Sequence, residues 1–128
     1  MNILRFEIYQ DIDETGEPEE FTWDLFPLVH SSQTIHLQEN GLPKIATHIK
    51  CNMIIVGKMG KTKEYTTYNR PSCLEIHGLP FEKIKAKYGN MWRDTSLYAT
   101  NESTGVVKNA YFENTTDGLK AVIELEKM

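Results

Sequence analysis

The sequence predicts a mainly β domain, an antiparallel sandwich or small barrel that ends in a C-terminal meander. Two observations favour this class. About eight short segments alternate between apolar and polar residues, and turn signals rich in Gly, Asn, Asp and Pro separate them. The alternative is an α+β fold in which one helix packs on the sheet.

The composition is typical of one globular domain. The chain has 128 residues, of which 40% are hydrophobic and 25% charged, so we expect residues 1–128 to form a single core. No run of apolar residues is long enough to span a membrane. The first nine residues carry Arg5 and Glu7 and lack the apolar stretch of a signal peptide. We therefore expect a cytoplasmic protein.

The N-terminal third predicts short strands. Residues 3–9 alternate between apolar and polar side chains, as in a half-buried strand. Residues 21–29 contain a proline and predict a short strand or turn-like plug that packs Trp23 and Phe26 inward. Turn residues bracket a brief strand at 34–38.

The middle of the chain predicts the centre of the sheet. Residues 45–56 alternate over the longest stretch and place Cys51 on the core face, as an inert thiol. Glycines predict a turn at 57–60, and residues 63–69 predict the partner strand. Residues 80–88 fit either a strand or a helix, and the regular alternation of lysines slightly favours a strand.

The C-terminal third predicts the meander. Strands are expected at 91–100, 106–113 and 119–126, and Asp-Gly at 117–118 is a hairpin signal. Alternate residues of the last strand would face the core. Val122 is the one apolar residue that this register leaves on the outer face.

Charge is unevenly distributed along the chain. The net charge is −4, but residues 1–40 hold nine acids and one base, whereas residues 41–93 hold ten bases and three acids. The two segments could fold against each other and cancel. Alternatively, they could form separate faces that steer a charged partner.

The acidic segment is the predicted site for a protein partner. Carboxylates that attract a basic surface stand there beside aromatic side chains that can anchor it. The predicted contact residues are Asp11, Asp13, Glu14, Glu17, Glu19, Glu20, Phe21, Trp23 and Asp24. We therefore expect a non-catalytic binding protein that engages a basic surface, such as a small acidic inhibitor, an immunity-type protein or a phage accessory protein.

The alternative is a barrel that binds single-stranded nucleic acid. Segment 58–93 combines cations for phosphates with rings on which bases can stack. The residues of this alternative are Lys58, Lys61, Lys63, Tyr65, Tyr68, Arg70, Lys83, Lys85, Lys87, Trp92 and Arg93.

Catalytic motifs are absent from the sequence. It contains no nucleophile elbow, phosphate-binding loop or dinucleotide fingerprint, so we assign no catalytic residue and expect neither a cofactor nor a metal. Residues 11–16 resemble the opening of a calcium loop, but Thr22 stands where the bidentate Glu is required. His48 and His77 lie on neighbouring predicted strands, and whether they converge on a metal is left open. A small-ligand-binding or enzymatic barrel is the further alternative.

Overall fold

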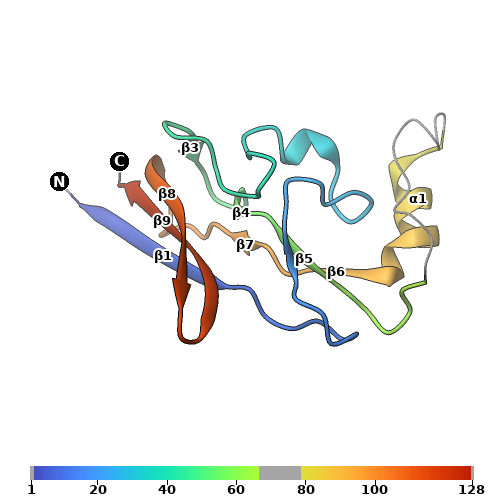
Figure 1. The fold of residues 1–128 in the computed structure, drawn as a ribbon. Helices are drawn as coiled ribbons and strands as arrows, with labels where there is room; N and C mark the ends of the chain where they lie inside the picture. The colour runs from blue at the N-terminus through green and yellow to red at the C-terminus, as the bar shows by residue number, and fades with distance from the viewer. Residues whose placement is uncertain (1, 67–78, 128) are drawn as a thin grey trace.

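The computed structural model describes residues 2–66 and 79–127, which form a mainly β, antiparallel fold with one α-helix (Figure 1). The strands are β1 (Ile3–Tyr9), β2 (Glu20–Phe21), β3 (His48–Ile49), β4 (Ile54–Val56), β5 (Lys58–Lys61), β6 (Trp92–Asp94), β7 (Leu97–Tyr98), β8 (Gly105–Thr115) and β9 (Gly118–Glu126). The helices are α1 (Phe81–Tyr88) and the short 3₁₀ helices η1 (Ser31–Gln33) and η2 (Gly89–Met91). The predicted fold class is confirmed.

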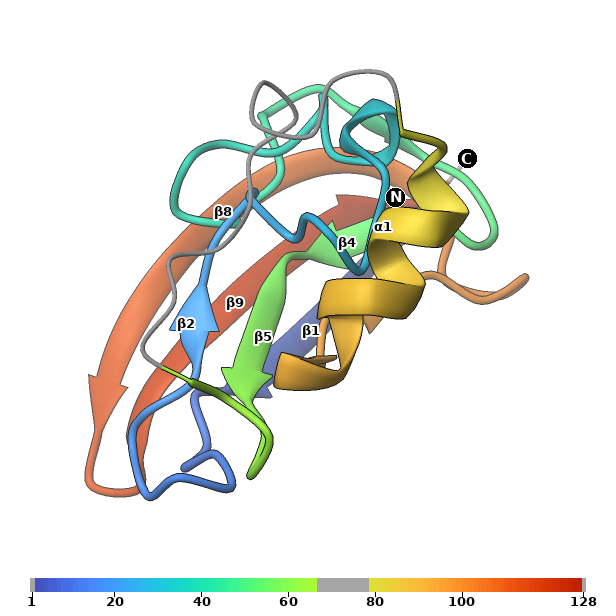
Figure 2. The same ribbon diagram turned by 90° about the vertical axis from the view of Figure 1, so that its right-hand side faces the viewer.

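The largest sheet has the strand order β1-β9-β8-β3, with every pair antiparallel. Figure 2 shows this sheet curling around β2, β4 and β5. Two smaller antiparallel sheets, β2-β5-β6 and β4-β7, complete the architecture. Both termini lie at the end of the molecule opposite α1 (Figure 1). Within the described residues, no helix has the length and apolar character needed to cross a bilayer.

Two apolar clusters form the core. The first lies inside the curled sheet, where Ala121, Ile123 and Leu125 of β9 are fully buried with Ile55 and Val56. The second lies toward α1, and its buried members are Leu25, Val29, Leu37, Ile54, Met59, Met91 and Trp92. The alternation predicted for β1 and β9 places their apolar residues in the first cluster.

Val122 is fully buried although it lies on the outer face of β9. Glu7 of β1 and Tyr111 of β8 stand opposite it in register. Arg5 donates a hydrogen bond to the Tyr111 hydroxyl (3.3 Å) and forms ion pairs with Glu7 and Glu124. The apolar stems of these long side chains exclude water from Val122 while their polar ends remain at the surface.

The predicted central strand at 45–56 is wrong. Only β3 and β4 form there, because Ala46 and Asn52 have positive φ angles (71° and 73°) and interrupt the extended backbone. Cys51 stands beside the second interruption and is exposed, so its predicted place in the core is also wrong.

Strand β5 occupies the segment that the glycines predicted to be a turn. Gly57 and Gly60 serve close packing instead: a Cβ on Gly57 would lie 2.2 Å from the carbonyl oxygen of Thr22. Residues 63–66 form no strand, and residues 67–69 of that prediction lie outside the described residues. The strand predicted at 34–38 is also wrong, because η1 precedes it and only an isolated Leu37–Pro43 bridge forms.

Residues 81–88 form α1, so the slight preference for a strand was wrong. The helix buries Ile84, and the Phe81 ring packs against Phe26 with 6.0 Å between ring centroids. Trp23 is 42% exposed and does not pack inward as predicted, whereas Phe26 is half-buried. The strand predicted at 91–100 divides into β6 and β7.

Replacement of Gly57 tests the close packing of β5 against residue 22. We expect Gly57→Ala to lower the free energy of unfolding by at least about 2 kcal/mol, because backbone atoms must move to admit the methyl group. Gly89→Ala is the matched control, since its Cβ would meet only ordinary 3.4 Å contacts. Urea unfolding measures both. Equal stability of the two variants would contradict the packing described.

Candidate binding surface

The acidic loop folds around the carboxylate of Asp13. Its Oδ1 accepts hydrogen bonds from the backbone N–H groups of Thr15 (2.9 Å) and Glu17 (3.1 Å), and Oδ2 accepts one from the Lys61 N–H (3.1 Å). Burial raises the pKa of this carboxyl, but these bonds together with the Thr15 hydroxyl hold the pKa below its usual range. The side chain predicted to meet a partner therefore organises its own loop.

Glu19 and Lys58 form a buried ion pair. Lys58 Nζ lies 2.6 Å from Glu19 Oε1, and the two side chains are only 4% and 8% exposed. Lys58 Nζ also donates to the Tyr9 carbonyl (2.9 Å), and the Asp11 N–H donates to Glu19 Oε1 (2.9 Å). Burial raises the pKa of Glu19, yet the bonds from Lys58 and Asp11 outweigh it and lower the pKa.

Two further ion pairs tie the loop to β5 and β6. Glu17 Oε2 lies 2.5 Å from Lys61 Nζ, and Glu14 Oε2 lies 2.7 Å from Arg93 Nη2. These three pairs show the acidic and basic segments folding against each other, the first of the two alternatives that the charge distribution allowed. Asp11, Glu20 and Asp24 have exposed side chains.

The residues of the nucleic-acid alternative differ widely in solvent exposure. Lys58 and Trp92 are buried, at 3% and 7% exposure, and Tyr65 packs edge-on against Trp92 at 5.9 Å. The exposed cations are Lys63, Lys83, Lys85, Lys87 and Arg93. Arg93 forms the ion pair with Glu14. Tyr68 and Arg70 lie outside the described residues. Both described rings of this set thus pack against each other rather than face solvent.

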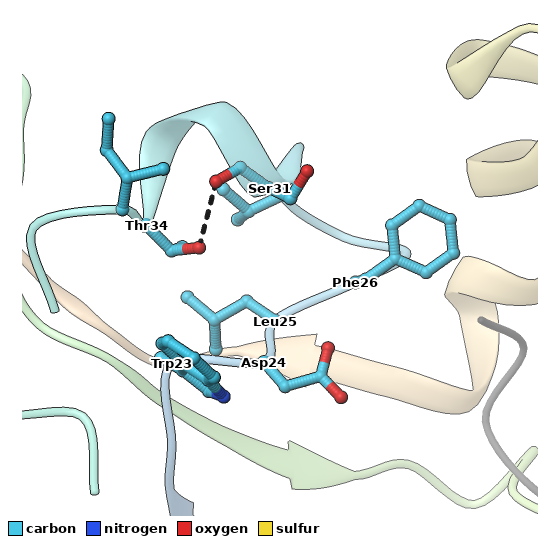
Figure 3. Close-up of a pocket in the computed structure, with 8 residues that line it drawn as sticks. Trp23, Asp24, Leu25, Phe26, Ser31 and Thr34 are labelled. Atoms are coloured by element: carbon cyan, nitrogen blue, oxygen red, sulfur yellow. Dashed lines mark hydrogen bonds between the residues drawn. The ribbon is translucent and has the colours of Figure 1, made fainter. Parts of the chain in front are cut away.

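A cavity of about 410 Å³ opens beside Trp23 (Figure 3). Its lining residues are Trp23, Asp24, Leu25, Phe26, Val29, Ser31, Thr34 and Ile35. Figure 3 shows Trp23 and Leu25 on one side and Ser31 and Thr34 across from them. The Thr34 hydroxyl donates a hydrogen bond to the Ser31 carbonyl (3.1 Å). Trp23 is 42% exposed and Ile35 is 73% exposed.

The loop that forms this cavity is held by its own backbone. The N–H groups of Leu28 and Val29 donate to the Leu25 carbonyl, at 2.8 and 3.1 Å, and bring the chain around a tight turn. Leu25 is buried beneath the cavity, so the side chains that follow it are presented from a fixed base. Asp24 is the one ionisable residue of the lining. Such a cavity suits an apolar side chain better than an acid–base reaction.

A second cavity, of about 420 Å³, lies on the other side of Ile35. Its lining residues are Ser32, Gln33, Ile35, His36, Cys51, Asn52, Met53, Ile54 and Tyr98. Two of its polar side chains are hydrogen-bonded: His36 Nε2 to the Ile54 carbonyl (2.6 Å), and the Tyr98 hydroxyl, which donates to Asp94. Burial and that carboxylate raise the pKa of Tyr98. Ile35 lines both cavities and is 73% exposed.

Whether the two histidines of the open metal question converge is not tested by the described residues. His48 is exposed on β3, and His77 lies outside the described residues. Sequence reasoning singled out Trp23 and Asp24 but missed Ile35 and Tyr98. A signal was available for Ile35, because Ser31 and Ser32 predict a turn in which a following apolar residue can remain exposed.

Removal of one member of the buried pair tests its role. We expect Glu19→Gln to lower the free energy of unfolding by about 3 kcal/mol at pH 7, since Lys58 would remain buried and charged. Glu17→Gln, which breaks a more exposed pair, should cost less than about 1 kcal/mol.

The stability difference between wild type and Glu19→Gln should also depend on pH. The folded-state pKa of Glu19 is lowered, so its contribution is complete above the unfolded-state value of 4.5 and is lost as the pH falls through the folded-state value. Denaturant unfolding at several pH values measures this. A difference that grows on acidification would contradict the assignment.

No model of a known protein family matches this chain.

Proposed function

We propose that this protein is a non-catalytic binding protein that engages another protein through the surface around Trp23 and Ile35. The observation that carries the proposal is the exposure of these two large apolar side chains at the mouths of two cavities. In this arrangement Ile35 can enter a partner while the cavities receive side chains from it.

Burial of this surface would supply substantial affinity. Covering a large aliphatic side chain contributes roughly 2 kcal/mol, and tryptophan is among the residues that most often dominate interfaces. Trp23 lies two residues after the end of β2, and its N–H donates to the Glu39 carbonyl (3.3 Å), so its backbone is fixed before a partner arrives. A preorganised aromatic anchor loses little conformational entropy on binding.

Beside Trp23 the rim is acidic and favours a basic partner, whereas beside Ile35 the Nζ of Lys44 donates to the Ile35 carbonyl (3.1 Å). Asp24 lines the first cavity, and the exposed Glu39 lies next to the backbone of Trp23. A partner that presents an apolar side chain flanked by Lys or Arg would complement this arrangement. The chain as a whole carries a net charge of −4, which also favours such a partner. An inhibitor, an immunity-type protein or a phage accessory protein could each act in this way.

Ion pairs within the chain reduce the contribution of the acidic loop to the attraction of a basic partner. Glu14, Glu17 and Glu19 are already paired with Arg93, Lys61 and Lys58 within the chain. Long-range steering by those three carboxylates is therefore weakened, and the proposal depends mainly on apolar contact close to Trp23. Rim carboxylates still influence the association rate.

Serine substitutions on the surface test the proposal. The immobilised wild-type chain should retain a specific protein from a lysate of its source cells, and Trp23→Ser and Ile35→Ser should each weaken that binding at least about tenfold, or 1.4 kcal/mol. Ile45→Ser is the matched control, because Ile45 is 57% exposed but lines neither cavity.

The retained protein would be identified by mass spectrometry and its affinity measured with the purified pair. Ile35→Ser and Ile45→Ser should melt near the wild-type temperature, whereas Trp23→Ser should melt lower because Trp23 is only 42% exposed. The proposal is wrong if every protein that the wild type retains is retained equally by Trp23→Ser and Ile35→Ser.

A further inference from the structure

Among residues 2–66 and 79–127, strand β8 has no strand partner along much of its outer edge. Strand β3 and the residues just before it pair with β8 at 105–107, and the register shift that follows Val107 ends this pairing. From Asn109 to Thr115, β8 pairs with β9 on one side. On the other side, no backbone hydrogen bond from another described residue reaches it. Figure 2 shows this part of β8 as the outer boundary of the curled sheet.

The hairpin geometry defines which groups point outward. Thr115 and Gly118 close a two-residue turn, and such a closing pair is hydrogen-bonded across the ladder. Hydrogen-bonded and outward-facing positions alternate along β8, so Asn114, which precedes the closing pair, and every second residue before it direct their N–H and C=O groups away from β9. These residues are Ala110, Phe112 and Asn114. In agreement, the Ala110 N–H is bonded to the Asn109 side chain (3.1 Å) rather than to β9.

An open groove of about 700 Å³ adjoins this edge. Its lining residues are Gln10, Glu17, Pro18, Glu19, Glu20, Phe21, Asn40, Phe112 and Leu119. The rings of Phe21 and Phe112 pack at 5.0 Å between centroids and form an apolar floor. Phe112 thus belongs to both features: its main-chain groups lie on the free edge and its ring lies in the groove.

We infer that the β8 edge accepts an extended segment of a partner protein, which adds a strand along Ala110–Asn114 and carries alternating apolar and basic side chains. Main-chain hydrogen bonds to an exposed edge provide affinity, and pockets for alternate side chains provide specificity. The apolar side chains would pack on Phe21 and Phe112, while cations would lie near the carboxylates of the lining. This edge is a different surface from the one around Trp23.

Charge complementarity favours a basic partner over a second copy of this chain. Glu17, Glu19 and Glu20 line the groove, whose lining contains no Lys or Arg, and Lys61 and Lys58 pair with the first two from outside the lining. Glu113 is also exposed on the same stretch of β8. The chain carries a net charge of −4, so two copies repel each other, whereas a segment rich in Lys and Arg is attracted.

A proline on the edge tests the strand addition. Asn114→Pro removes an outward N–H and places a ring on the edge, yet leaves the ladder to β9 intact. Asn114→Ala is the matched control, because it retains the N–H. The probe is the acetylated, amidated peptide Lys-Val-Arg-Phe-Lys-Val-Lys, titrated into ¹⁵N-labelled protein at low salt and followed by NMR.

We expect saturable binding with shifts at the amides of Ala110, Phe112 and Asn114. Binding should be at least about tenfold weaker for Asn114→Pro than for Asn114→Ala. The same peptide N-methylated at alternate residues should lose binding to the wild type, which keeps the test decisive if Asn114→Pro does not fold. Trp23→Ser should bind the peptide as the wild type does.

Three outcomes would overturn the inference. The first is no saturable binding of the peptide up to about 1 mM. The second is equal binding of the plain and N-methylated peptides, which would show that the backbone edge is not used. The third is a wild-type dimer that Asn114→Pro converts to a monomer, because the edge would then be occupied by a second copy.

Discussion

Glu19 and Lys58 are removed from water together, at the point where the acidic loop meets β5. A charge buried in this way is tolerated only with an opposite charge and further hydrogen bonds, which the Tyr9 carbonyl and the Asp11 N–H provide here. The pair fixes the path of the chain into β2 and so determines where Trp23 emerges. Because the loop charges are largely paired inside the molecule, the account of recognition depends on exposed apolar side chains and on the outward-facing main chain of β8.

The regular parts of the fold could be predicted from the sequence because local signals agreed there. Alternation identified β1 with its bounds, and Asp-Gly at 117–118 identified the β8–β9 hairpin. Residues 45–56 alternate as well, but Ala46 and Asn52 adopt the left-handed conformation. Asparagine adopts this conformation more often than most residues, whereas nothing about an alanine indicates it. For residues 80–88 the alternation of lysines slightly favoured a strand, but the segment forms α1, in which Ile84 is buried and Phe81 packs against Phe26.

The site was only partly predictable because its elements are brought together over long separations. The unequal distribution of charge was visible, but which carboxylate meets which lysine was not: Glu19 and Lys58 are 39 positions apart. Trp23 was identified as an aromatic beside acids, yet its exposure depends on the turn at Leu25. Tyr98 was not identified, because only its position beside the loop around Ile35 makes it part of a cavity.

A double-mutant cycle on the buried pair tests the central claim most directly. The free energies of unfolding of wild type, Glu19→Gln, Lys58→Met and the double variant would be measured by urea denaturation at pH 7. We predict a coupling energy of at least about 2 kcal/mol, far above the value typical of exposed pairs. A coupling energy below about 0.5 kcal/mol would show that the two charges are not held together away from water, and the account of the loop would be wrong.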